Sequence, residues 1–178
     1  MGKSFLNNSD FPRGIRNNNP GNLILTNENW LGKVPNSQNT DGHFEQFTEI
    51  RYGIRAMMRN IVSKNKKGNN TVTDLISVLS PAFENDTAGY VATVANTLGI
   101  SPTIAIELSQ ESLIAICKII ATVENGQQYS KLITDTDYRD AIAILGIPLK
   151  KKSSSKGLLI FLALIIAGII GYKIYKRK

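Results

Sequence analysis

Apolar residues recur at intervals of three or four positions through most of the chain after residue 50, the spacing that places them on one face of a helix. Short interruptions rich in Gly, Pro, Asn or Ser separate these segments, and such residues favour helix ends and turns. We predict five helices, at 50–61, 72–79, 90–98, 110–123 and 137–145. Thr71 or Thr73 would cap the second helix and Ser109 the fourth, in which Val123 lies on the apolar face. Gly68, Pro81, Gly99 and Gly146 would end the first, second, third and fifth helices. The pattern therefore predicts a mainly α fold.

The first fifty residues lack a long periodic segment and are dense in Asn, Gly and Pro. Side chains of Asn bond to nearby backbone groups, so this composition is typical of a loop-rich region held by hydrogen bonds. Residues 43–47 alternate between polar and apolar positions and are the best candidate for a strand. We expect a loop-rich N-terminal lobe in front of the helical part.

The C-terminal segment carries no charge from residue 157 to residue 172, and residues 173–175 can extend it because a lysine stem can reach the membrane interface. A buried core helix is the alternative, but that helix would need polar positions on one face. We therefore predict a transmembrane helix at 157–175 that places the protein in a lipid bilayer. Small residues at Ala163, Ala167 and Gly171 form a stripe that favours weak self-association.

The net charge of +7 is concentrated in this segment, since residues 150–178 hold eight Lys or Arg and no acid. Residues 1–149 hold thirteen Lys or Arg against fourteen Asp or Glu, a net charge of −1. The folded part thus lacks the basic footprint of a nucleic-acid binder, and we expect no nucleic-acid partner. Four cations lie on each side of the apolar segment, so charge does not decide its orientation.

The most specific local pattern is RGIRNNNPGNL at residues 13–23. It predicts either a tight, self-bonded loop or a groove in which amide and turn groups bind a polar, uncharged ligand such as a sugar. Trp30 follows and can stack on a sugar ring, although a single tryptophan more often fills a core.

A second pattern, Glu124-Asn125-Gly126, ends the fourth predicted helix. The helical register puts Glu124 beside the apolar stripe, where partial desolvation would raise its pKa and suit it to act as a general acid. The alternative is an exposed glutamate beside a helix end. Glu84 precedes the third helix and is a possible second carboxylate, whereas Asp86 or Thr87 would cap that helix.

Other chemistries are poorly supported by the composition. The chain has one histidine, His43, and one cysteine, Cys117, which makes a zinc cluster implausible. Cys117 lies among isoleucines, where a buried and inert thiol is expected. We predict no metal and no cofactor.

The ordered patterns resemble a group of small phage and prophage proteins, described as structural proteins or as lytic transglycosylase-like. The resemblance covers residues 13–147 and rests mainly on RNNNPGN, with weaker support from Trp30-Leu31-Gly32, Phe44 and Phe47, Glu84 to Thr87 with Tyr90, and Glu124-Asn125-Gly126 with Tyr129. The pieces also resemble those of lysozyme-like glucosaminidases and transglycosylases in a changed order, as in a circular permutation. In that comparison Asn125 stands where the usual motif has Ser.

The resemblance implies a small lysozyme-like domain with Glu124 as its catalytic acid. The substrate-binding residues that it implies are Asn19, Gly21, Asn22, Trp30, Phe44, Tyr90 and Tyr129. The expected organisation is an N-terminal tail (1–12), this domain (13–147), a basic Ser/Lys hinge (148–156), a transmembrane helix (157–175) and a basic tail (176–178).

These features predict a membrane-anchored phage virion protein that cleaves peptidoglycan during genome entry and contacts other virion proteins. Two alternatives remain open at this level: a structural or glycan-binding protein of the virion membrane without turnover, and an accessory protein of host lysis. The sequence does not separate a hydrolase from a lyase.

Overall fold

The computed structural model describes residues 2–79 and 87–150, and within these ranges the protein is mainly α-helical. The helical elements are α1 (Arg13–Arg16), the 3-10 helix η1 (Asn36–Gln38), α2 (Ile50–Lys66), α3 (Val72–Leu79), α4 (Thr87–Leu98), α5 (Gln110–Asn125), α6 (Gln127–Ser130) and α7 (Asp135–Ala143). Pairing between extended segments in the described ranges is limited to isolated bridges, such as Ile24 with Phe44 and Lys33 with Phe47. The predicted strand at residues 43–47 is therefore wrong, because hydrogen bonds to loop groups replace a ladder there.

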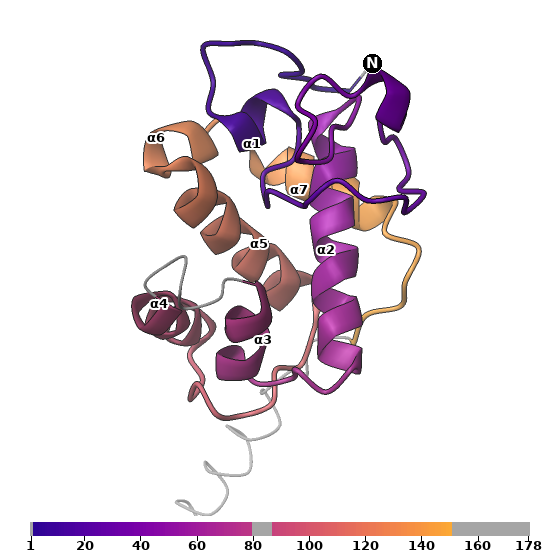
Figure 1. Ribbon diagram of the computed structural model, residues 1–178. Coiled ribbons are helices and arrows are strands. Elements are labelled where there is room, and N and C mark those ends of the chain that lie inside the picture. The colour runs from indigo at the N-terminus through magenta and orange to yellow at the C-terminus, as the bar shows by residue number, and fades with distance from the viewer. Residues whose placement is uncertain (1, 80–86, 151–178) are drawn as a thin grey trace, which may run out of the picture.

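Two longer helices, α2 and α5, enclose most of the core (Figure 1). The pair α3 and α4 lies at one end, while α1, α6 and the N-terminal loops lie at the other, and α7 packs along α2. The core is built from fully buried side chains of these helices, among them Ile54, Met58, Leu75, Ile76, Leu113, Ile116 and Tyr138. Burial of such side chains supplies the main stabilisation, about 1.5–3 kcal/mol for each one.

The predicted helices exist, and α3, α5 and α7 start at polar caps. Ser109 caps α5 through a capping box with Ser112, and the hydroxyl of Thr71 accepts a hydrogen bond from the backbone N–H of Asp74. The last helix begins at Asp135, two residues before its predicted start, because Thr134 forms a capping box with Asp137. Local side-chain chemistry thus fixes these boundaries.

The predicted apolar face of α5 requires a correction at Val123, which is 45% exposed. A helix turns by about 100° per residue, so the face marked by Leu113 and Ile120 continues to position 124 and not to position 123. The buried residues Ala121 and Asn125 both lie on one side of that direction and widen the buried face there. Glu124 therefore occupies the inward face of the last turn, where the core ends.

Buried amide side chains hold the N-terminal loops together. Asn17, Asn18 and Asn19 are at most 1% exposed. The amide of Asn18 receives a hydrogen bond from the N–H of Phe5 and donates one to the carbonyl of Phe47, so it joins two segments far apart in sequence. The prediction of a lobe held by side-chain hydrogen bonds is confirmed for this part of the chain.

Close packing between this lobe and α2 depends on Gly53. A Cβ at that position would lie 1.7 Å from the carbonyl oxygen of Asn18, a distance that the backbone cannot accept. The asparagine loop, the segment that contains Asn17, Asn18 and Asn19, therefore packs directly on α2.

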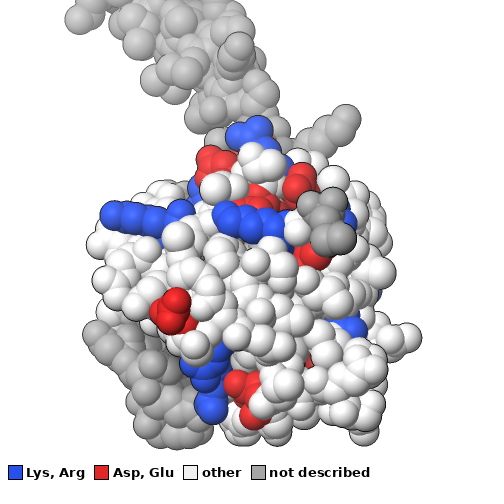
Figure 2. Space-filling view, turned by 90° about the horizontal axis from the view of Figure 1, so that it is seen from above, with Lys and Arg blue, Asp and Glu red and all other residues white. Residues whose placement is uncertain are grey.

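The predicted anchor at 157–175, with Ala163, Ala167 and Gly171, lies outside the described residues. Among the helices within residues 2–79 and 87–150, none has the length and apolar character needed to cross a membrane. Figure 2 shows basic and acidic side chains interspersed around a broad uncharged area on the face that carries the N-terminal loops.

Candidate active site

A cleft of about 620 Å³ opens between the N-terminal loop and four helices. Its lining comes from the loop after α1 and from α2, α3, α4 and α5, and includes Gly21, Asn22, Leu23, Glu28, Trp30, Met57, Asn60, Ile61, Leu79, Tyr90, Ile120 and Glu124. A volume of this size can hold a small ligand or a few rings of a polymer. The lining combines apolar side chains, such as Met57 and Ile120, with polar ones, such as Asn22 and Glu124.

Glu124 is the partly buried carboxylate at the end of α5, and Asn22 fixes its position. The Nδ2 of Asn22 donates a hydrogen bond of 2.8 Å to the Oε2 of Glu124 across 102 positions of sequence. The backbone of Asn22 has a φ of 45°, in the left-handed region, which asparagine tolerates better than most residues. The turn of the NPGN segment thus aims an amide at the carboxylate.

Tyr90, on α4, lines the same cleft as Glu124 and is 5% exposed. Burial raises the pKa of the Tyr90 phenol, and the negative charge of Glu124 raises it further. The phenol therefore stays protonated and can donate a hydrogen bond at neutral pH.

Two amide oxygens near this carboxylate accept no hydrogen bond from the described residues: Oδ1 of Asn22 and Oδ1 of Asn125. Both approach Gly14, where a Cβ would lie 2.7 Å and 2.3 Å from them. The Nδ2 of Asn125 donates to the carbonyl oxygens of Pro20 and Ala121, so this residue joins the end of α5 to the loop. Buried acceptors without donors are uncommon, and here they lie directly behind the site.

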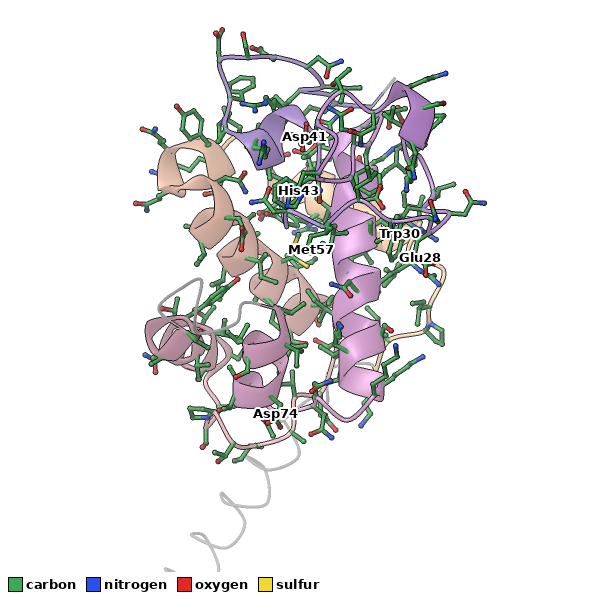
Figure 3. The ribbon with its side chains drawn as sticks, viewed as in Figure 1. Glu28, Trp30, Asp41, His43, Met57 and Asp74 are labelled. Carbon is green, nitrogen blue, oxygen red and sulfur yellow. The ribbon has the colours of Figure 1, made fainter. Side chains whose placement is uncertain are left out.

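Trp30 stands at the junction of the cleft with a second hollow of about 530 Å³. Figure 3 places Trp30 and Glu28 beside α2, with Met57 between α2 and α5. Trp30 is partly buried and does not belong to the core, so its ring is available to a ligand. The segment that carries it is held by an ion pair of 2.8 Å between Lys33 and Glu45.

The structure brings together five of the predicted site residues, namely Gly21, Asn22, Trp30, Tyr90 and Glu124. Three others lie elsewhere. Asn19 is buried and bonds to the backbone of Leu23 and Glu45, while Phe44 contacts Arg13 and Tyr129 contacts Phe11, away from the cleft lining. Glu84 is outside the described residues.

Several cleft residues were not predicted from the sequence, notably Glu28, Met57, Arg59, Asn60 and Lys64. Glu28 lies two positions before Trp30, and this proximity is a signal that could have suggested it. The residues of α2 gave no such signal, because their periodic spacing already explained them as helix.

Within the described ranges, no group of three His, Cys, Asp or Glu side chains lies close enough together to hold a metal ion. Cys117 is fully buried, and burial raises the pKa of its thiol, as expected for an inert side chain. The polar chemistry of the cleft thus rests on carboxylate, amide, phenol and cationic groups.

The fold and the cleft define a mainly helical protein with a ligand-sized cavity in which the carboxylate of Glu124 is held by Asn22. No protein-family model matches the chain. Over 118 residues it is 33% identical to Protein P5 of Pseudoalteromonas phage PM2, a stretch that covers 64% of this chain and 71% of the phage protein. The chain therefore belongs to the family of that phage protein.

Proposed function

We propose that this protein cleaves the glycan strands of peptidoglycan, with Glu124 as the general acid and base. The observation that carries the proposal is the hydrogen bond from Asn22 to Glu124 in the wall of a cleft that also holds Trp30. A positioned carboxylate, an aromatic ring and amide groups are what a sugar polymer needs for binding and cleavage. The proposed lysozyme-like character of the domain has the same support.

In the first step, the protonated Glu124 gives its proton to the oxygen of the glycosidic bond as the bond to C1 breaks. In the second step, the same carboxylate takes the proton of the 6-hydroxyl of the muramic unit while O6 bonds to C1. The product is an anhydro sugar, and the proton is back on the enzyme. One carboxylate suffices, because the substrate supplies its own nucleophile.

The neighbours of Glu124 suit a group that must change its protonation state. The Nδ2 of Asn22 stabilises the carboxylate, and the Oδ1 of the same amide can accept from the protonated acid after the amide rotates. Apolar residues such as Ile120 and Leu79 line the same cleft, and desolvation by such residues is the condition that favours a neutral acid. The raised pKa that the sequence predicts for Glu124 stays a prediction.

The family relationship with a bacteriophage protein supports a role in the phage particle. We propose that the chain is a virion protein, held in a membrane by residues 157–175, which opens the cell wall locally during genome entry. Its partners are then peptidoglycan, the lipid bilayer and other virion proteins.

Digestion of purified peptidoglycan by the full-length protein in detergent tests the activity. We expect the wild type to release anhydro-muropeptides, detected by mass, and Glu124→Gln to lower the rate by roughly 10²–10⁴-fold because the proton donor is lost. Reducing-end products that depend equally on Glu124 would instead indicate a hydrolase.

The matched control is Glu107→Gln, which changes a carboxylate that is 67% exposed and outside the cleft. This variant should cleave at the wild-type rate. If folded wild-type protein binds peptidoglycan but releases nothing, the protein is a glycan-binding or structural component instead of an enzyme.

A further inference from the structure

The second hollow beside Trp30 contains two neighbouring arginines of α2, Arg55 and Arg59. They are four positions apart, so they lie one above the other on the same face of the helix. The Nη2 of Arg55 and the Nη1 of Arg59 lie 3.9 Å and 4.0 Å from the place of a Cβ on Gly146. The two guanidinium groups therefore converge on one region of space.

Neither of these guanidinium groups forms an ion pair within residues 2–79 and 87–150. Burial, together with the positive charge of Arg59, lowers the pKa of Arg55. Lys33, in the same hollow, is already paired with Glu45, and Glu28 is exposed and outside ion-pair distance of both arginines. The pair is thus an uncompensated positive charge in a recess.

A structural role accounts for part of this arrangement. Arg55 donates through Nε to the carbonyl of Ile144 at 2.7 Å, and Arg59 donates through Nη1 to the carbonyl of Leu145 at 3.2 Å. These bonds close the C-terminal end of α7. Each guanidinium has five N–H donors, so most donors of each remain for a ligand.

The hollow continues the cleft, since Glu28, Trp30 and Arg59 line both. A glycan strand that stacks on Trp30 would therefore carry its substituents past the two arginines. In peptidoglycan these substituents are stem peptides, whose free carboxylates are planar anions that fit the forked geometry of a guanidinium.

We propose that Arg55 and Arg59 form a subsite for a carboxylate of the peptidoglycan stem peptide. This inference rests on the proposed function, which places a glycan strand in the cleft. The subsite makes the protein selective for strands that carry charged stems.

Sedimentation with insoluble peptidoglycan tests the subsite, using the full-length Glu124→Gln protein in detergent so that binding is separated from turnover. Two substrates are compared: native sacculi and sacculi with stem carboxylates converted to amides. We expect native sacculi to bind roughly tenfold more tightly than the amidated sacculi, a usual size for one charge-assisted contact.

Adding Arg55→Gln or Arg59→Gln should reduce binding of native sacculi to the level of the amidated substrate. The matched control is Arg139→Gln, an exposed arginine of α7 outside the hollow, which should leave the preference unchanged. Because both arginines also close α7, each variant is first compared by thermal unfolding. Arg59→Lys keeps the charge but loses the fork, and should retain only part of the preference.

Equal binding of native and amidated sacculi would overturn the subsite, and so would a preference that survives in folded arginine variants. Cleavage is measured separately with the protein that retains Glu124. A preference for charged stems without any released product would contradict the proposed enzyme but support the subsite. Cleavage without the preference would support the proposed enzyme but contradict the subsite.

Discussion

At the residue scale, asparagine side chains hold the segments of the N-terminal loops and the carboxylate of Glu124 in position. An amide has a donor and an acceptor on one rigid group, so it can join two segments without adding charge. Asn17 does this between Asp41 and Gln46, and Asn19 does it between Leu23 and Glu45. Asn22 differs because it uses its amide on a carboxylate of the cleft and leaves its oxygen without a partner in the described part of the chain.

We predict that Asn22→Gly lowers the rate of peptidoglycan cleavage by about 10–100-fold with little change in stability. Glycine accepts the positive φ of this position, so the backbone stays relaxed while Glu124 loses its hydrogen bond. The rate of muropeptide release and the midpoint of thermal unfolding are measured together. Asn96→Gly would be a poor control because it lies inside α4, whereas Asn27→Gly changes an exposed loop asparagine and should leave both values unchanged.

A second substitution at this residue tests the proton transfer itself. Asn22→Asp places a negative charge beside Glu124, and a like charge raises the pKa of a carboxyl group. The basic limb of the pH–rate profile, which reports loss of the proton from the acid, should move to higher pH. An unchanged profile in a folded and active variant would contradict the role of Glu124 as the acid.

Acid should weaken the N-terminal lobe through Asp41. Burial alone would raise the pKa of this carboxyl, but hydrogen bonds from Asn17 and the backbone of Phe44, together with the charge of Arg13, lower it below 3.8. A lowered folded-state pKa means that the stabilisation is complete above the unfolded value and disappears as the pH falls through the folded value. Unfolding in urea should show this loss as the pH falls below the ordinary value of 3.8, and Asp41→Asn should flatten it.

At the scale of elements, the contact between the asparagine loop and α2 is the most sensitive to added volume. Alanine in place of glycine usually stabilises a helix interior by about 1 kcal/mol. For Gly53→Ala we expect the opposite, a loss of roughly 1–3 kcal/mol, because the new methyl group would overlap the carbonyl of Asn18.

Urea unfolding of the full-length protein measures this effect. Lys66→Ala, at an exposed position near the end of α2, is the control and should stay within about 0.5 kcal/mol of the wild type. A stabilising effect of Gly53→Ala would mean that the loop does not rest on the helix.

The sequence predicted the longer helices well, because each one has an apolar face, and because α3, α5 and α7 also have a polar cap that acts locally. It did not predict the last turn of α5, where Val123 is exposed and Glu124 faces inward. Val123 was placed at the end of the apolar stripe because it is apolar. The rotation of about 100° per residue instead turns position 124 toward the core. The strand prediction at 43–47 failed for a related reason, since alternation occurs without a partner strand when loop hydrogen bonds satisfy the backbone.

The candidate site was predictable where residue chemistry is unusual and not where it depends on long-range packing. Asn22, Trp30 and Glu124 stand out in the sequence and meet in the cleft. Arg55 and Arg59 do not stand out, since exposed arginines are common on helices. Their importance follows from the position of the Trp30 loop and of α7, which one sequence does not reveal.

For the molecule as a whole, the apolar segment at 157–175 predicts attachment to a bilayer. Leu164→Lys combined with Ile165→Lys should prevent flotation of the full-length protein with liposomes, because each central lysine costs about 2.5–3.5 kcal/mol. Leu164→Ile with Ile165→Leu keeps the apolar character and should float as the wild type does. Flotation of the double lysine variant would contradict the anchor.

The bond between Asn22 and Glu124 spans 102 positions, and the bond from Asn125 to Pro20 spans 105. During synthesis, the N-terminal loop is therefore complete long before the residue that it must hold. A ribosome-bound chain that ends before α5 lacks Glu124 and Ile120, two residues of the cleft lining. Under the proposed function, the ability to cut peptidoglycan arises only when nearly the whole folded part has been made, so a chain terminated before α5 cannot damage the cell wall.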